Sequence, residues 1–332
     1  MQKTRSRLIK TAVIAMLAVA ASNSQALSQN TYPKPITGTN VTITSGGLKR
    51  TFIVHIPPTP KSSPGAVLIF HGGSGSPTAA SRMQALTLMD NVADREGFYS
   101  VYPQALNGHW TDGRVSTQGG ADDVLFIKDI AAYLQKTYQV SSAKIFSAGV
   151  SNGGIMQYQL ACTAPGLIRA IAPIAADMTL AMQTSCLPSK VTPLIMFMGT
   201  ADQYMPYGGG YPVVYTSKSA SVATASQNAK YTSTAVTDEF ASAPATAAFW
   251  AALNGCKSST SADLPNKAND GTSVTKMGYT SCSTGGGTNL YTIINGGHTW
   301  PGTTRGDPLM GLTSADISAN EEMVAFFKLF GL

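Results

Sequence analysis

The feature that most constrains the fold is a regular alternation of short apolar strand-like segments with helix-like segments, beginning near Asn40. The strand-like segments cover residues 51–56, 66–70, 98–102, 144–148, 169–174, 193–198 and 290–294, and the helix-like segments cover 79–95, 152–162, 244–254, 317–330 and a stretch that begins at 122. Short apolar strands that alternate with helices are typical of a parallel sheet buried on both faces. We therefore predict an α/β fold with a mostly parallel central sheet and helices on both faces.

The chain is long enough and apolar enough to form one large core. It has 332 residues, of which 43% are hydrophobic and 12% are charged. These values exclude a disordered chain and a small disulfide-stapled protein. No internal repeat occurs, so we expect a single domain over residues 27–332.

The first 26 residues are typical of an export signal. A basic start is followed by an apolar run, Thr11–Ala21, and by small residues that end at Ala26. Eleven helical residues rise only about 16 Å, roughly half the hydrocarbon core of a membrane. We predict a signal peptide over residues 1–26 and a secreted or periplasmic protein without stable membrane insertion, an uncleaved N-terminal anchor being the alternative.

The net charge of +6 does not indicate nucleic-acid binding. Four of the 23 basic residues lie within the first 26 positions, which contain no acid, and the remainder has 19 basic against 17 acidic residues. A nearly neutral surface without a Lys/Arg cluster lacks the counterion release that drives binding to phosphate backbones. We expect no nucleic-acid partner.

Four cysteines, Cys162, Cys186, Cys256 and Cys282, lie at spacings that do not suit a zinc site. In an oxidising compartment two disulfides are expected, and three pairings are possible. We favour Cys162 with Cys186 and Cys256 with Cys282, because each of these disulfides would tie an irregular segment to a neighbouring predicted core element. Four buried free thiols are the alternative.

The segment Gly149-Val-Ser-Asn-Gly153 matches the pattern G-x-S-x-G between a predicted strand and a predicted helix. This context suits a nucleophile elbow, in which a sharp turn presents the serine hydroxyl at a helix N-terminus. The pattern alone also arises by chance in glycine-rich chains. We predict that Ser151 is the catalytic nucleophile.

A serine nucleophile needs a histidine base and an acid that orients the histidine. Among the four histidines only His298 follows Ser151, as the order nucleophile, acid, histidine requires. Asp202 follows an apolar strand between them, in the turn Gly199-Thr-Ala-Asp202. We predict Asp202 as the acid and Asp177 as the second candidate. The alternative is that Asp202 only caps its turn.

The loop after the strand at 66–70 contains His71-Gly-Gly73, where an oxyanion hole usually finds its second donor. We assign the N–H groups of Asn152 and Gly73 as the donors, the alternative being that the glycines only form a tight turn. Trp300 and Tyr204 are our candidate substrate-binding residues, although single aromatic residues are more often core. We expect the irregular segment 203–238 to border the active site or to be a surface insertion.

Together, His71-Gly-Gly73, Gly149-Val-Ser-Asn-Gly-Gly154, Gly199-Thr-Ala-Asp202 and Gly296-Gly-His-Thr-Trp-Pro-Gly302 resemble the secreted polyhydroxybutyrate depolymerase and feruloyl esterase group of α/β-hydrolases. The resemblance implies an α/β-hydrolase fold and ester hydrolysis through an acyl-enzyme, without metal or cofactor. It implies Ser151, Asp202 and His298 as the triad and agrees with the two local disulfides. Met198 departs from the group, which often has histidine there, and the segment after Gly210 is longer.

We therefore predict a secreted serine esterase whose substrate is an oligomeric polyester or a plant cell-wall ester. Depolymerases that attack solid polymer tend to carry a linker and a binding domain, which this chain lacks before it ends at Leu332. Soluble hydroxyalkanoate oligomers or feruloyl-type esters are thus the expected substrates. A peptidase on the same fold and a non-catalytic exported binding protein are the alternatives.

Overall fold

The fold is organised around a ten-stranded sheet with the strand order β1-β2-β4-β3-β5-β6-β7-β10-β9-β8. The computed structural model describes residues 38–212, 238–304 and 308–332, all within the unit Lys34–Leu332. The strands are β1 (Thr39–Ser45), β2 (Leu48–His55), β3 (Ala66–Phe70), β4 (Tyr99–Pro103), β5 (Ile145–Val150), β6 (Ile171–Ile174), β7 (Leu194–Gly199), β8 (Ser258–Asp263), β9 (Ser273–Thr280) and β10 (Thr288–Ile294). The six neighbouring strands from β4 to β10 are parallel, and the outer strands on both sides pair antiparallel.

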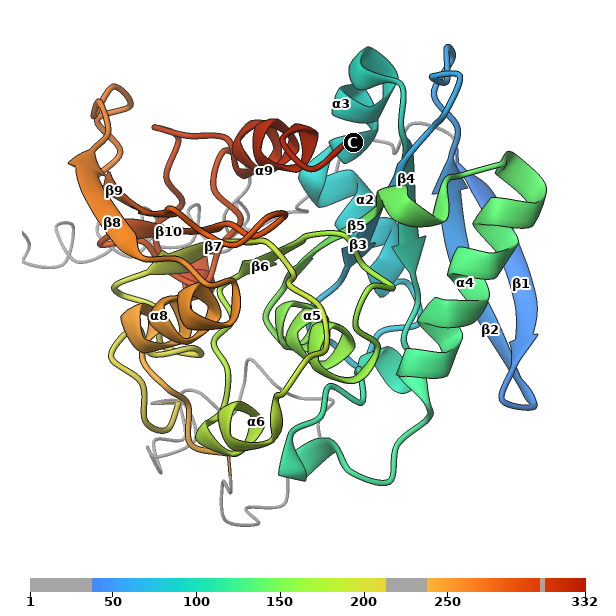
Figure 1. Cartoon of the computed structure of the whole chain (residues 1–332), viewed down its shortest axis with the longest axis horizontal. Coiled ribbons are helices and arrows are strands. Elements are labelled where there is room, and N and C mark those ends of the chain that lie inside the picture. Colours follow the sequence, from blue (N-terminus) through green and yellow to red (C-terminus); the bar gives the residue numbers. More distant parts are fainter. Residues whose placement is uncertain (1–37, 213–237, 305–307) are drawn as a thin grey trace, which may run out of the picture. The chain divides into compact units, whose positions relative to one another are not determined.

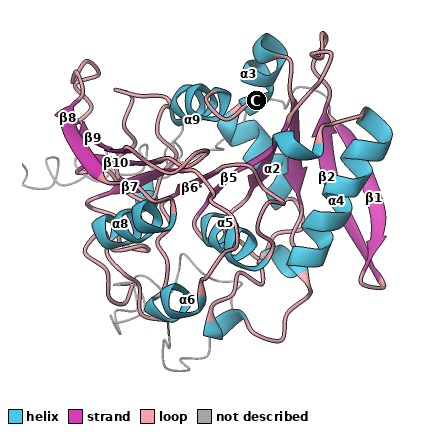
Figure 2. Cartoon of the chain, viewed as in Figure 1, coloured by secondary structure: helices cyan, strands magenta, loops and turns pink. Residues whose placement is uncertain are grey.

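Helices cover both faces of the sheet (Figures 1 and 2). The α-helices are α2 (Ala79–Thr87), α3 (Met89–Glu96), α4 (Asp123–Tyr138), α5 (Asn152–Thr163), α6 (Leu180–Ser185), α8 (Ala243–Leu253) and α9 (Ala319–Lys328). Helices α4, α5 and α8 pack in one core cluster, and α2, α3 and α9 in a second. This arrangement confirms the predicted α/β fold.

The alternation of side chains along β3 shows how one strand serves both cores. Leu68 and Phe70 belong to the cluster with α4, α5 and α8, whereas Val67 and Ile69 belong to the cluster with α2, α3 and α9. All four are fully buried. Because successive side chains point to opposite faces, a strand covered on both sides must be apolar throughout, which is the sequence pattern that predicts it.

The structure departs from the sequence prediction in one helix that is broken and in several elements that were not predicted. The predicted helix over 79–95 is two helices, because Leu88 adopts a left-handed conformation with φ 50° between α2 and α3. The antiparallel strands β1, β8 and β9 and the short helix α6 were not predicted. Every residue of β8 is exposed, so this Ser/Thr-rich strand shows no hydrophobic alternation that a sequence pattern could detect.

Both disulfides that the sequence analysis favours are present, Cys162–Cys186 and Cys256–Cys282. They join cysteines that are 24 and 26 residues apart in the sequence. In the part of the chain that the structure describes, no helix has the length and apolar character needed to cross a membrane. The predicted signal peptide lies outside the described residues.

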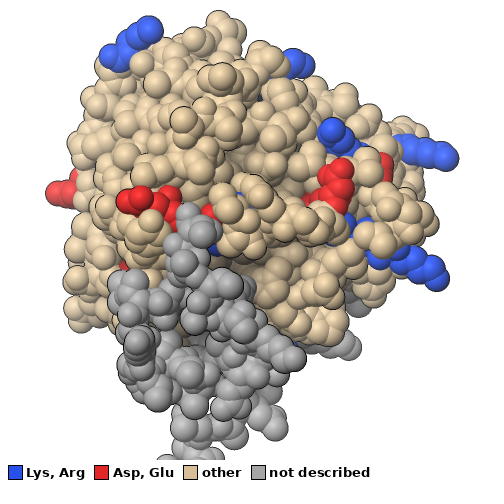
Figure 3. Space-filling view, turned by 90° about the horizontal axis from the view of Figure 1, so that it is seen from below, with Lys and Arg blue, Asp and Glu red and all other residues tan. Residues whose placement is uncertain are grey.

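Charged side chains are sparse on the face of the molecule shown in Figure 3. The lysine and arginine side chains are separated from one another there, and most of the surface is uncharged. This view agrees with the 12% charged residues of the sequence.

Candidate active site

Ser151 occupies a strained turn between β5 and α5. Strand β5 ends at Val150 and α5 begins at Asn152, so the serine is the N-cap residue of the helix. Its backbone has φ 56° and ψ −127°, and its N–H donates to the carbonyl oxygen of Ile174 at 2.9 Å. A residue with a side chain adopts a positive φ only where the surroundings enforce it, and such strain is concentrated at functional sites.

Close packing accounts for the glycines that flank this serine. A Cβ atom added at Gly153 would lie 2.4 Å from the carbonyl oxygen of His71, and one at Gly149 would lie 2.6 Å from the carbonyl oxygen of Gly153. At Gly154 it would lie 2.5 Å from Cβ of Ala176. Neighbouring atoms therefore pass too close to the turn for any larger residue.

Asp202 and His298 are hydrogen-bonded to each other. Nδ1 of His298 lies 2.8 Å from Oδ2 of Asp202, and the Asp202 side chain is fully buried. Oδ1 of Asp202 accepts the backbone N–H groups of Tyr204 and Met205, both at 2.8 Å. Both oxygens are thus engaged, so the carboxylate holds a proton on Nδ1 of the imidazole and leaves Nε2 to act as a base.

The runner-up acid, Asp177, has a different environment. It is fully buried, and neither carboxyl oxygen has a hydrogen-bond partner among the residues that the structure describes. Burial raises its pKa well above the usual value, and the nearby charge of Asp202 raises that pKa further. Burial therefore favours the neutral form of the Asp177 carboxyl, whereas Asp202 both caps its turn and bonds the histidine.

The strand order brings the three predicted triad residues to one edge of the sheet. Ser151 follows β5, Asp202 follows β7 and His298 follows β10, and these strands run parallel with β6 between β5 and β7. Asp202 and His298 meet because β7 and β10 are neighbours. Among the described residues, no hydrogen bond joins Ser151 to His298. Such contacts often tighten only when substrate binds.

The loop after β3 lies against the serine turn. A Cβ atom added at Gly72 would lie 3.4 Å from Cβ of Ser151, and one at Gly73 would lie 3.6 Å from Cβ of Asn152. A Cβ at Gly73 would also lie 2.7 Å from Nδ1 of His109. The two predicted oxyanion-hole residues, Gly73 and Asn152, are therefore adjacent, and the glycine leaves room for the histidine ring.

His71 fixes the conformation of this loop. Its Nε2 accepts the N–H of Ala105 at 3.1 Å, so its Nδ1 is the donor to the carbonyl oxygen of Gly72 at 2.7 Å. Burial lowers the pKa of His71 to about 4, which keeps the ring neutral as this tautomer requires. Trp110 Nε1 donates to the carbonyl oxygen of His71 at 2.8 Å. The histidine of the His-Gly-Gly segment is thus a structural residue.

The sequence did not predict a hydrogen-bond network around Asp112. The side chain of Asn152 accepts the N–H of Trp110 at 2.7 Å and donates to Oδ2 of Asp112 at 2.6 Å. Asp112 is fully buried and also accepts Nε of Arg114 at 2.9 Å and the hydroxyl of Thr117 at 2.9 Å. This network ties an irregular loop to the residue after the nucleophile. A lone aspartate in a polar, glycine-rich stretch gave no signal for it.

The two aromatic residues predicted to contact substrate lie in different places. The ring centroid of Tyr204 is 5.2 Å from that of His298, and the tyrosine is half-buried. Trp300 is 2% exposed, belongs to the core beside α9, and donates its Nε1 to Asn320 Oδ1 at 3.0 Å. The structure therefore gives Trp300 a packing role, which its position two residues from His298 did not reveal.

Only the ends of the irregular segment 203–238 are described. Gly210 pairs with Phe240 at one end, and Asp238 accepts the N–H of Val115 at 3.0 Å and the hydroxyl of Ser116 at the other. The contacts of Asp238 place that end beside the loop that carries Asp112. Residues 213–237 lie outside the described part of the chain. Within that part, no cluster of His, Cys, Asp and Glu side chains has the arrangement of a metal site.

Two known proteins are similar to this chain in sequence. The chain is 28% identical over 240 residues to feruloyl esterase B of Piromyces equi, a match that covers 72% of this chain and 38% of that protein. It is 26% identical over 290 residues to NocK of Nocardia uniformis subsp. tsuyamanensis, provisionally named an esterase, with 84% of this chain and 79% of that protein covered. In sequence the chain resembles the feruloyl-esterase-like α/β-hydrolases. No protein-family model matches it.

The fold of this α/β-hydrolase also matches a solved structure. The acetyl xylan esterase from Aspergillus awamori superposes with a TM-score of 0.56 over 89% of this chain and 100% of that one, at 14% sequence identity. The likeness concerns the fold alone. The chain spans less than two fifths of the length of the Piromyces relative.

Proposed function

We propose that the protein is a secreted serine esterase that cleaves carboxylic esters with Ser151 as nucleophile, His298 as base and Asp202 as orienting acid. The observation that carries the proposal is the Asp202–His298 hydrogen bond at the same sheet edge as the strained Ser151. A paired histidine and a strained serine at one edge have no evident use in a purely structural protein.

The proposed reaction proceeds in two steps through an acyl-enzyme. Nε2 of His298 takes the hydroxyl proton as Ser151 Oγ attacks the ester carbonyl carbon, and the imidazolium then gives that proton to the leaving alcohol. Water, deprotonated by His298, then attacks the acyl carbonyl carbon. The bond to Ser151 Oγ breaks as the imidazolium returns the proton to that oxygen, which releases the acid and restores the free serine. The N–H groups of Gly73 and Asn152 would stabilise the oxyanion, each donor contributing about 3 to 4 kcal/mol.

We propose the substrate class from the names of the relatives. The named activities of the relatives, feruloyl esterase above all, favour hydroxycinnamoyl or related cell-wall esters over hydroxyalkanoate oligomers. Tyr204, beside His298, is a candidate contact for an aromatic acyl group. The two disulfides are compatible with export, which we propose from the N-terminal sequence.

The deciding experiment compares the wild type with Ser151→Ala on a substrate panel of methyl ferulate, acetylated xylan, hydroxybutyrate oligomers and p-nitrophenyl butyrate. We expect ester turnover by the wild type only, and fluorophosphonate labelling at Ser151 that the variant loses. Turnover of a peptide anilide without ester turnover would favour the peptidase alternative. No labelling and no turnover would favour a binding protein.

A further inference from the structure

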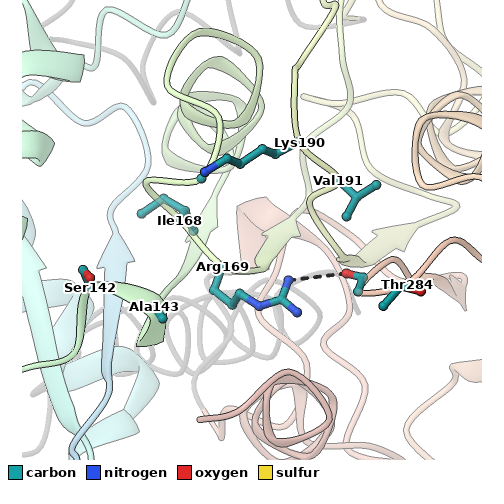
Figure 4. Close-up of a pocket in the computed structure, with 9 residues that line it drawn as sticks. Ser142, Ala143, Ile168, Arg169, Lys190, Val191 and Thr284 are labelled. Carbon is teal, nitrogen blue, oxygen red and sulfur yellow. Dashed lines mark hydrogen bonds between the residues drawn. The ribbon is translucent and has the colours of Figure 1, made fainter.

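A cavity of about 410 Å³ lies at the sheet edge opposite the candidate active site (Figure 4). Its walls come from four segments, each of which leads into a parallel strand. Ser142 precedes β5, Arg169 precedes β6, Lys190 precedes β7 and Gly285 precedes β10. The catalytic candidates follow the other ends of these strands, so the cavity is separate from them.

Two cations line this cavity, and no acid is among its lining residues. Arg169 is half-buried and Lys190 is exposed, and the ion pairs among the described residues involve neither of them. The Arg169 guanidinium donates to the carbonyl oxygen of Gly285 at 3.4 Å and lies 5.2 Å from the ring centroid of Phe330. A guanidinium has five N–H donors, so most of its hydrogen-bonding capacity remains for a ligand.

Glycines let both cations lie close to the backbone of the cavity wall. Gly166 has φ +89°, and a Cβ atom there would lie 2.9 Å from Nζ of Lys190. Gly285 has φ +80°, and a Cβ atom there would lie 3.3 Å from a terminal guanidinium nitrogen of Arg169. Figure 4 shows the lysine extending toward Ile168 and the guanidinium toward the turn at Thr284. The positive charges are thus held at two walls of one cavity.

The two disulfides brace these walls. Gly166 and Lys190 lie four residues after Cys162 and Cys186, which are bonded to each other. Thr284 lies two residues after Cys282, the partner of Cys256. Cross-links this near the lining residues limit the rearrangement of the cavity, and a pre-organised site loses less entropy when it binds a ligand.

We propose that this cavity is a second ligand site, which binds an oxyanion carried on a molecule of about monosaccharide size. Arginine and lysine without acidic partners form charge-assisted hydrogen bonds to carboxylate or phosphate oxygens. A volume of about 410 Å³ falls within the range of small-molecule sites, roughly 300 to 1,000 Å³. The site does not depend on the proposed esterase activity.

Titration calorimetry on the full disulfide-bonded chain tests this site. The probes are D-galacturonate, D-glucose 6-phosphate, inorganic phosphate and uncharged D-galactose, at pH 7 and low ionic strength. We expect saturable binding of at least one charged sugar, with a Kd of about 1 mM or tighter, and none of galactose. The two charged sugars distinguish a carboxylate from a phosphate ligand.

Variants separate the cavity from the general surface charge. Lys190→Gln and Arg169→Gln should each weaken binding of the charged sugar at least about tenfold. Lys136→Gln, an exposed cation on α4, and Ser151→Ala should leave it unchanged. Thermal melts check that each variant folds; Lys190 is exposed, so its replacement tests the site even if Arg169→Gln is unstable.

Three outcomes would overturn the proposal. The first is no saturable binding of either charged sugar up to about 50 mM. The second is binding that Lys190→Gln leaves intact. The third is binding of inorganic phosphate that is as tight as the binding of both charged sugars. This result would show that the sugar contributes nothing to binding. Loss of ester turnover in Ser151→Ala affects none of these readouts, so the two proposals fail independently.

Discussion

Nδ1 of His298 lies 2.8 Å from Oδ2 of Asp202, although 96 residues separate them in the chain. The carboxylate is fully buried, and its other oxygen is held by two backbone N–H groups. A buried carboxylate held in this way orients the imidazole ring and sets its tautomer. This pair sets the direction of proton transfer that we propose for the site.

Ser151→Ala and His298→Ala should each lower kcat for p-nitrophenyl butyrate at least about a thousandfold, because triad residues act as a unit. Circular dichroism should match the wild type for both variants, and the thermal melt should match it for Ser151→Ala. His298→Ala should melt at a lower temperature, because the buried Asp202 Oδ2 loses its partner. A His298→Ala enzyme with near-normal kcat would remove the base from the proposed mechanism.

Asp202→Asn should reduce kcat at least about a hundredfold, because an amide can present its NH2 group to His298 and reverse the imidazole tautomer. Asp177→Asn is the matched control: its carboxyl makes no hydrogen bond to the histidine, so kcat should change less than about threefold. If Asp177→Asn lowered kcat more than Asp202→Asn did, Asp177 would be the acid instead.

Asp177→Asn should also change how stability depends on pH. Its carboxyl pKa is raised in the folded state by burial, so the stability it contributes is present at low pH and is lost as pH rises above about 4. The melting temperature of the variant relative to the wild type should therefore increase between pH 4 and pH 8. Differential scanning calorimetry measures this, and a constant difference would contradict it.

Asp112→Ala should lower kcat about 10- to 100-fold, because it removes the buried carboxylate that the Asn152 amide and the Arg114 guanidinium share. Asp122→Ala is the control, because this exposed aspartate only caps α4 through the N–H of Leu125. It should cost about 1 kcal/mol of stability and leave kcat intact. An unchanged kcat in Asp112→Ala would separate the loop from catalysis.

Gly153→Ala should destabilise the fold by at least about 2 kcal/mol, because the added Cβ meets carbonyl oxygens of His71 and Phe70 at 2.4 and 2.8 Å. Backbone atoms cannot move aside cheaply. Gly208→Ala, where no atom lies within 4 Å of the added Cβ, should stay within about 0.5 kcal/mol of the wild type. Urea unfolding gives both values, and equal losses would show that close backbone packing does not require glycine at the serine turn.

Much of the fold was predictable because buried parallel strands must be apolar on both faces. Strand β3 coincides with its predicted segment, and α5 begins at the predicted Asn152. Strand β8 was not predictable, since it is exposed along its whole length and carries no hydrophobic pattern. The break at Leu88 was missed because leucine is a common helix residue, so the sequence gives no sign that its backbone is left-handed.

The sequence by itself determined the candidate nucleophile, the order of the triad candidates and the classes of element that carry them. Local chemistry suffices there, because few structural roles require a glycine-flanked serine between a strand and a helix. Only the tertiary structure showed that Asp202 bonds His298, placed Trp300 in the core and joined Asp112 to Asn152. Those distinctions depend on burial and on which distant groups meet, and neither is encoded in the spacing of residues along the chain.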